Sequence, residues 1–531
     1  MVVTLKAGTL LGFTESFGVA DTSNANGKVV VEGGTFGLLN TYTDNFTKKG
    51  ELQHSDSADH NVDVDLPKGA TLLLTLGQDV EMGKLSVAEG AKVVASSVDA
   101  ETLKAIYNGE AQKGSLKASE VADLGATMER AAGATGLDRL ELSNDPLPFA
   151  KTTLSVDNAI KTISTTVERD ESKTFASYAS NANEESVAKA LEALGAGTIF
   201  DSIVTSTSSS EVAQTMASLG DDFFLTTGNA NVTHGLILSR AILDQATGIG
   251  DGRKTEMLDG HGRIWATGVG SWTTLDRSNG DADSDFYAGV IGVDADVTDN
   301  TKLGVFFGAG TTNTKAGQNK VESDDVHVGL YGMSTVADVA RLSYGVMYSH
   351  LDGESIRTLQ VGSQFGYTKL NTNTNVTQLF AEAAYAGFNT ATYSVEPYVG
   401  FSFLHATTSD LDELVAGADV STKMDSRNLE VLTLGVRGAV PFATWGASTI
   451  SAKANLGWSH FFGDTEAEGS MSFGGTAVAQ LKGEKLENLF NVGFGLEAQL
   501  GKAATAGLSY TGSYNSNVKP HGVMANIRFL F

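Results

Sequence analysis

Apolar and polar side chains alternate along the chain from about residue 262 to the C-terminus. Within residues 303–310, the odd-numbered positions are Leu, Val, Phe and Ala, whereas the even-numbered positions are mostly glycine. A period of two residues is typical of a β-strand, in which successive side chains point to opposite faces. The alternating segments run to ten or more residues, above the usual length of about five or six. The same pattern recurs at residues 395–403, 490–500 and 508–514.

These strands predict either a soluble sandwich, with the apolar face in a core, or a membrane barrel, with that face toward lipid. The connections favour a barrel, because tight turns at 298–301 and 501–502 alternate with long acidic loops such as 279–284. The second face is crowded with glycine, which suits a packed lumen better than a solvated surface. Roughly twelve strands are expected, an even number that closes an up-and-down barrel. The sequence therefore predicts a transmembrane β-barrel over residues 262–531.

The last strand ends on an aromatic residue. Ile527, Phe529 and Phe531 share one face of the period-2 pattern, and Arg528 and Leu530 share the other. An ordinary edge strand could show the same alternation. A closing strand of an outer-membrane barrel commonly ends in this way, because its terminal aromatic lies at the membrane interface.

Residues 183–246 have helical periodicity. Residues 183–194 place apolar side chains on one face, and residues 208–219 begin with capping and acidic residues. In a third segment, residues 229–246, Arg240 and Asp244 are four positions apart and able to pair across one turn. We therefore expect residues 181–261 to contain a helical linker and a further helix.

Residues 1–180 are predicted to be rich in β-structure. Glycine-punctuated apolar runs at 27–39, 69–76 and 83–95 suggest rungs of a β-solenoid, although a sandwich also fits their irregular spacing. Residues 99–107 and 119–132 have helical spacing and acidic starts, and are expected to interrupt a solenoid. Strand character then returns at 140–142 and 152–156.

Composition excludes several chemistries. The net charge of −26 argues against nucleic acid as a partner, because such binding requires a basic surface. The absence of cysteine excludes thiol catalysis and disulfides, and the nine histidines lack metal-ligand spacing, so no metal or cofactor is expected. The first residues lack the features of a signal peptide, and the barrel pattern leads us to expect that the numbering begins after a leader.

Residues 262–272, Gly-Arg-Ile-Trp-Ala-Thr-Gly-Val-Gly-Ser-Trp, follow a helical stretch and open the predicted barrel. Together with residues 287–296, residues 303–310 and the terminal Phe531, they resemble the translocator of the autotransporters. The resemblance covers about residues 180–531.

The resemblance implies type V secretion in the outer membrane of a Gram-negative bacterium, with residues 1–180 as a passenger, or the remnant of one, on the cell surface. It implies lipid and the barrel assembly machinery as partners. Residues 229–246 would thread the pore as a helix. The implied pore-helix residues are Asn229, Asn231, Arg240 and Asp244, and the implied membrane-assembly signal is Ile527, Phe529 and Phe531.

No catalytic motif is recognised. Neither a Gly-x-Ser-x-Gly elbow nor a Gly-Asp-Ser-Leu signature is present, and Ser271 has no evident base. Self-cleaving autotransporters are cut at adjacent asparagines, whereas Ala230 separates Asn229 from Asn231. Four histidines are expected near strand ends without a shared role: His327, His350, His405 and His460.

The prediction is thus a translocator that is not an enzyme. Its passenger would be adhesive or structural, with host or cell-surface ligands as further partners. The alternative is a surface-anchored hydrolase, an esterase or a protease, that uses the barrel as its anchor.

Overall fold

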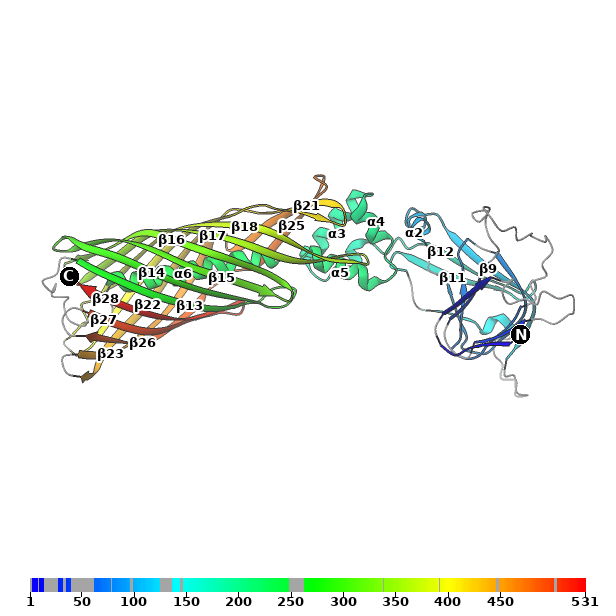
Figure 1. Ribbon diagram of the computed structural model, residues 1–531, viewed down its shortest axis with the longest axis horizontal. Coiled ribbons are helices and arrows are strands. Elements are labelled where there is room, and N and C mark those ends of the chain that lie inside the picture. Colours follow the sequence, from blue (N-terminus) through cyan, green and yellow to red (C-terminus); the bar gives the residue numbers. More distant parts are fainter. Residues whose placement is uncertain are drawn as a thin grey trace, which may run out of the picture. The chain divides into compact units, whose positions relative to one another are not determined.

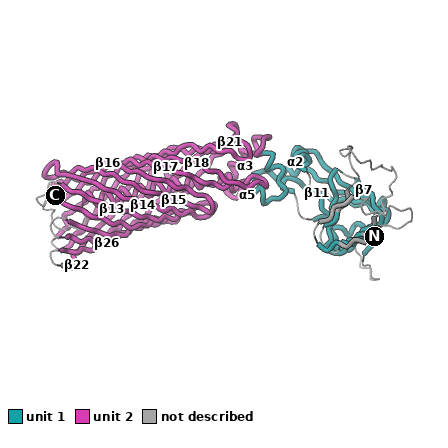
Figure 2. Tube along the Cα trace, in the orientation of Figure 1, with its two compact units in different colours: residues 1–178, 200–214 teal, residues 179–199, 215–531 magenta. Residues whose placement is uncertain are grey.

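A computed structural model describes residues 2–7, 9–13, 27–31, 35–39, 62–77, 79–95, 99–124, 136–143, 147–247, 262–337, 339–390, 392–445, 448–500 and 504–531. The chain forms two compact units (Figure 2). Unit 1 comprises residues 1–178 and 200–214, and unit 2 comprises residues 179–199 and 215–531.

Unit 1 is a parallel β-solenoid in which the chain passes alternately between two sheets (Figure 1). Val29, Val64 and Leu85 take the same register position in successive strands of one sheet, and Phe36, Leu72 and Val93 do so in the other. All six side chains are buried in one core, so each rung covers the apolar residues of the next. The solenoid interpretation is therefore confirmed, and the sandwich is wrong. The first sheet contains β1 (Val2–Leu5), β3 (Gly27–Val31), β5 (Val62–Leu66), β7 (Asp79–Val87) and β9 (Gln112–Asp123), and the second contains β2 (Thr9–Phe13), β4 (Thr35–Leu39), β6 (Thr71–Leu74), β8 (Lys92–Ala95) and β10 (Glu141–Leu142).

One of the two helices predicted within this unit is present. Helix α2 (Ala100–Tyr107) begins after Asp99, whose carboxylate accepts a hydrogen bond from the Thr102 backbone N–H. The helix predicted at 119–132 is wrong over 119–123, which belongs to β9, and residues 125–132 lie outside the described residues. Strand β9 pairs with β7 on one side and with β12 on the other, and these ladders override the local helical spacing. The inserted helix therefore does not interrupt the solenoid.

The last strands of unit 1 change direction. Strands β11 (Ala150–Asp157) and β12 (Thr162–Arg169) form an antiparallel pair, and β12 joins β9 in the first sheet. Tyr107, Phe149, Phe175 and Phe200 pack as an aromatic cluster, with the Arg169 guanidinium 4.3 Å from the centre of the Tyr107 ring. This cluster adds apolar cover beyond the parallel rungs.

The helical region contains four α-helices among the residues described there. They are α3 (Ala182–Leu194), α4 (Thr198–Val204), α5 (Ser209–Leu219) and α6 (Phe223–Thr247). The short helix α4 was not predicted, and α6 begins six residues before the predicted start at 229. The Asp221 carboxylate accepts a hydrogen bond from the Phe223 N–H at 2.7 Å, which satisfies a donor at the start of α6.

The second half of the chain forms a closed barrel of twelve strands, as the alternation predicted (Figure 1). Each strand pairs antiparallel with its neighbours, and β28 returns to pair with β13. The strands are β13 (Gly262–Leu275), β14 (Ala282–Thr298), β15 (Thr301–Ala316), β16 (Asn319–Val336), β17 (Ala340–Val361), β18 (Gln364–Tyr385), β19 (Ser394–Thr408), β22 (Arg427–Trp445), β23 (Ser448–Gly463), β26 (Leu489–Leu500), β27 (Ala504–Tyr514) and β28 (Val518–Leu530).

The outward face of the barrel is apolar. Buried and exposed positions alternate along β14 and β15, and the exposed ones include Ile291, Leu303, Val305 and Phe307. An exposed apolar band on a closed barrel is the surface that lipid covers, so this is a transmembrane β-barrel. No helix in the described part of the chain has the length and hydropathy needed to span a membrane.

Two hairpins project from one end of the barrel. Strands β20 (Leu411–Val415) and β21 (Ala418–Met424) lie between β19 and β22, and strands β24 (Glu466–Phe473) and β25 (Ala477–Lys485) lie between β23 and β26. Together they form a separate sheet in the order β20-β21-β24-β25. The opposite end of the barrel carries Gly262 and the C-terminus, whose backbones pair.

Glycine on the inner face makes room for large aromatic side chains. The Trp265 ring is buried and would lie 2.3 Å from a Cβ atom placed on Gly292. Its Nε1–H donates to the Tyr331 hydroxyl at 2.5 Å, and Tyr331 in turn contacts the Asp294 carboxylate. The glycine-rich face is therefore the packed lumen wall that the sequence pattern indicated.

Gly292→Ala is expected to destabilise the barrel by about 1–3 kcal/mol, because the added methyl overlaps the Trp265 ring. The temperature at which the folded form disappears in a heat-dependent gel-mobility assay measures this change. Gly289→Ala is the matched control on the same strand, since a Cβ atom there meets nothing within 4 Å. Equal midpoints for both variants would contradict this account of the inner-face glycines.

Candidate functional site: the barrel lumen and its helix

Helix α6 lies inside the barrel. Leu238 and Ile242 share a buried cluster with Trp265, Phe286 and Phe306 from the surrounding strands. A second cluster joins the helix to further strands of the wall, among them β19 and β22. It includes Ala230, Val232, Leu404 and Val431. A helix satisfies its own backbone hydrogen bonds and can therefore cross a lumen without leaving polar groups unpaired.

A network of opposite charges, buried on the wall side and partly buried on the helix, fixes α6 to the barrel wall. Arg240 donates from Nη1 to Glu382 Oε2 at 2.6 Å, and its Nε lies 3.3 Å from Asp244 Oδ1. Arg437 contacts the second oxygen of Glu382 and also pairs with Glu396 at 3.1 Å. Arg341 completes the network through Glu396. Glu382 thus joins the helix to strand β22, on which Arg437 lies.

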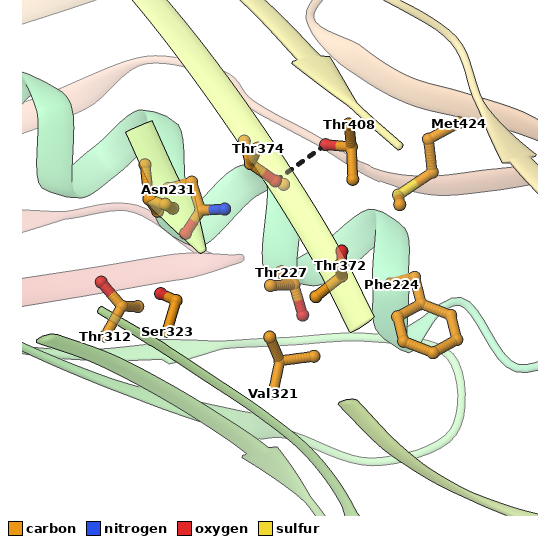
Figure 3. Close-up of a pocket in the computed structure, with 12 residues that line it drawn as sticks. Phe224, Thr227, Asn231, Thr312, Val321, Ser323, Thr372, Thr374, Thr408 and Met424 are labelled. Atoms are coloured by element: carbon orange, nitrogen blue, oxygen red, sulfur yellow. Dashed lines mark hydrogen bonds between the residues drawn. The ribbon is translucent and has the colours of Figure 1, made fainter. Parts of the chain in front are cut away.

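Asn229 and Asn231 occupy different environments. The Asn229 amide donates to the Glu484 carbonyl at 2.8 Å, and its oxygen accepts from Arg427 Nη1 at 2.8 Å. Asn231 faces a small cavity, and its Oδ1 is buried without a hydrogen-bond partner among the described atoms (Figure 3). The hydroxyl groups around this cavity come from Thr227, Thr312, Ser323, Thr372, Thr374 and Thr408.

Further ion pairs line the lumen. Arg263 binds Asp294 through two hydrogen bonds of 2.7 and 2.9 Å. Arg528 donates to Gln245 Oε1 at 3.1 Å, which connects the last strand to the helix. Lys453 and Glu497 pair at 2.6 Å. These paired charges offset the cost of desolvating polar groups in the packed interior.

The prediction of a position near a strand end is wrong for His350, which lies in the middle of β17, and also for His327. His327 sits near the middle of β16 and faces inward, where its Nδ1 is 2.8 Å from the Ser349 hydroxyl. His234 on α6 stacks against Phe286 with ring centres 5.0 Å apart, and Phe286 also contacts His327. Among the described residues, no group of three His, Asp or Glu side chains could hold a metal ion.

The C-terminal strand presents its aromatics outward. Ile527, Phe529 and Phe531 are 37%, 46% and 68% exposed, whereas Arg528 is buried toward the lumen and Leu530 is half-buried. The Phe531 backbone donates to and accepts from Gly262, with N···O distances of 3.0 and 3.2 Å. The last residue thus belongs to the seam that closes the barrel.

Acidic residues at the start of α6 meet an arginine from a barrel loop. Arg277 Nη1 lies 2.6 Å from Asp221 and 3.2 Å from Asp222. Burial raises the pKa of Asp222 to about 6, although the Arg277 charge opposes that rise and the Asp221 charge adds to it. The helix is therefore held at this end by charge as well as by packing.

The fold and the lumen define a transmembrane barrel with a helix inside it. The family model described as Autotransporter beta-domain matches residues 264–511. Residues 264–511 therefore match the autotransporter beta-domain, the family that the sequence resemblance indicated.

Solved structures similar to this chain include two autotransporter barrels. The beta domain of the Bordetella autotransporter BrkA has 18% identity and a TM-score of 0.41, over 51% of this chain and 100% of that chain. The translocator domain of the autotransporter NalP from Neisseria meningitidis has 12% identity and a TM-score of 0.45, over 57% of this chain and 98% of that chain.

Two proteins of Serratia marcescens, each named extracellular serine protease, are similar in sequence. One is 25% identical over 459 residues, which is 75% of this chain and 42% of the relative. The other is 26% identical over 351 residues, which is 63% of this chain and 32% of the relative. The chain thus spans less than half the length of either relative.

These relatives overturn the prediction that the protein is not an enzyme. That prediction depended on finding neither a Gly-x-Ser-x-Gly nor a Gly-Asp-Ser-Leu motif in this sequence. Such a search detects a nucleophile only where it lies within a known local motif. It cannot detect a serine whose base and orienting carboxylate lie far away in the sequence.

Proposed function

We propose that the barrel resides in the outer membrane and exports residues 1–180, which remain displayed at the cell surface. The observation that carries this proposal is that α6 packs inside a closed barrel. If residues 1–180 have crossed the membrane through the lumen, the part of the chain that follows them is left inside it. The outward apolar band supports outer-membrane lipid as a partner. The outward aromatics of β28 support recognition by the barrel assembly machinery.

An adhesive or structural role for unit 1 is one candidate for what is displayed. Its parallel rungs form regular side faces on which side chains repeat from strand to strand, as in solenoids that bind extended partners. Host or cell-surface ligands remain the proposed partners of those faces.

The experiment compares the full chain, preceded by an export signal, with a version that ends at residue 178. We expect an antibody to unit 1 to label intact cells that express the full chain and to leave cells that express the truncated version unlabelled. A periplasmic marker that stays unlabelled in both strains shows that the outer membrane is intact. Labelling that is equal in both strains would refute export through the barrel.

A second candidate is that the displayed protein is a surface-anchored serine protease. The similarity to extracellular serine proteases over 75% of this chain favours it. The test incubates membranes containing the full chain with a casein substrate, with and without a covalent serine-directed inhibitor. Hydrolysis that the inhibitor abolishes would support the protease, and the lack of such hydrolysis would argue against it.

A further inference from the structure

Residues 179–199 and 215–222 are held at one end of the barrel by three separate parts of the wall. These parts are the β24–β25 hairpin, the turn between β17 and β18, and the loop between β13 and β14. All three lie at the end opposite Gly262 and Phe531, because the strands run antiparallel. Every contact described below lies within unit 2.

Helix α3 binds the edge of the projecting sheet. The Asn183 side chain accepts from the Lys482 N–H at 2.9 Å and donates to the Lys482 carbonyl at 2.8 Å. Two residues earlier, the Gln480 N–H donates to the Ser186 hydroxyl at 2.9 Å. Strand β25 is the last strand of its sheet, so its outer edge carries unpaired backbone groups. The side chains of α3 occupy that edge as a neighbouring strand would.

The end of α5 is held by strand β17 and by the turn between β17 and β18. Arg357 donates from Nη2 to the Ser218 and Leu219 carbonyls, each at 3.2 Å, and its Nη1 pairs with Glu413 at 2.5 Å. The last carbonyls of a helix carry partial negative charge and lack partners within the helix. The Gly362 N–H also donates to the Thr215 hydroxyl at 2.9 Å. Arg357 is buried and lies on β17. It therefore connects the end of α5 to β17 and, through Glu413, to β20.

Helices α3 and α5 contact each other, and α5 is followed almost directly by α6 in the lumen. A Cβ atom on Gly220 would lie 2.8 Å from the Glu184 backbone, so the end of α5 touches the start of α3. Only residues 220–222 separate α5 from α6, and Asp221 is paired with Arg277. The position of α5 at the mouth therefore fixes where α6 begins inside the barrel.

We propose that these contacts form a latch that closes after export, with residues 179–199 and 215–222 as the bound segment. The inference rests on the proposed export function. The latch can form only when this segment has left the lumen, since its receptor groups project from the far end of the barrel. Once closed, the latch anchors the chain that follows the passenger without requiring α6. A mechanical force applied to the passenger is therefore borne by the latch contacts before it is transmitted to α6 in the lumen.

Lys189 on α3 provides a reporter for the latch. It is the only lysine or arginine between residues 173 and 240, and its side chain is 66% exposed. A docked helix resists trypsin because cleavage requires local unfolding. The test uses the full chain in intact cells, with trypsin outside, and follows the new N-terminus at Ala190 by mass spectrometry.

The double variant Asn183→Ala/Ser186→Ala removes three hydrogen bonds to β25. Cleavage after Lys189 is expected to become roughly tenfold faster, with the barrel still folded by gel mobility. Ser210→Ala/Gln214→Ala is the matched control, since it also replaces a hydroxyl and an amide, at exposed positions of α5. Its cleavage rate is expected to equal that of the unaltered chain.

An unchanged cleavage rate in the double variant, with unit 1 at the surface, would overturn the latch and leave export intact. Failure of the unaltered chain to display unit 1 would instead overturn the export proposal. If the double variant does not assemble, Arg357→Gln tests the same latch from the barrel side. It must also accelerate cleavage after Lys189, and an unchanged rate there would equally overturn the latch.

Discussion

Glu382→Ala is expected to destabilise the barrel by about 3–5 kcal/mol, because it removes the carboxylate that the buried Arg437 and the partly buried Arg240 share. Arg240 on α6 and Arg437 on β22 both contact Glu382, whose side chain is 2% exposed. The variant should also loosen α6, since Glu382 is the direct ionic contact between Arg240 and the wall. Heat-dependent gel mobility measures the stability, and single-channel conductance in planar bilayers detects loosening of the helix.

Glu354→Ala is the matched control for this prediction. Glu354 also pairs with a cation across neighbouring barrel strands, Lys369 at 2.7 Å, but the two side chains are 47% and 58% exposed. Exposed pairs contribute only about 0–1 kcal/mol, so this variant should behave like the unaltered barrel. If Glu382→Ala were as stable as Glu354→Ala, the buried network would not be what holds α6 in the lumen.

The barrel was predictable because its pattern is local. In residues 303–310 each side chain shows which face it occupies, and the glycines on the other face leave room for neighbours such as Tyr331. The same holds for the solenoid, where a short apolar run such as residues 27–31 is a complete unit of the fold. The Arg240–Asp244 pair could also be anticipated, since four residues separate its members on one helix.

The partners of those residues could not be predicted in this way. Glu382 lies 142 residues from Arg240 and 55 from Arg437, and only the register of β18, β19 and β22 brings them together. At Glu120 and Val121 the local pattern is clear but predicts the wrong element, a helix instead of strand β9. Their helical spacing is real, but they pair in register with Lys84 and Leu85 in the solenoid, and that ladder decides their structure. The contact of Asn183 with Lys482, 299 residues apart, gives no signal in either local sequence.

Phe531→Ser is expected to lower the amount of barrel in the outer membrane far more than the loss of its folded-state contacts explains. Burying a phenylalanine stabilises a protein by about 1.5–3 kcal/mol, and Phe531 is 68% exposed on the outward face, so its packing contributes less. Its ring covers Gly262 at the closing seam, but its backbone hydrogen bonds to Gly262 do not depend on the side chain. A large decrease in the amount of inserted barrel would therefore arise before folding, when the assembly machinery recognises the outward aromatics of the last strand.

Leu530→Ser separates that explanation from a general effect at the terminus. Leu530 is the neighbouring residue in the same strand, pairs with Arg263 and is half-buried on the lumen face. Its replacement should leave the amount of membrane-inserted barrel nearly unchanged, as measured by quantitative blotting of outer-membrane fractions. Equal losses from both variants would show that the face on which the residue lies is irrelevant. Normal assembly of Phe531→Ser would remove the terminal aromatic from any role in insertion, and would leave Ile527 and Phe529 as the outward residues of β28 to test next.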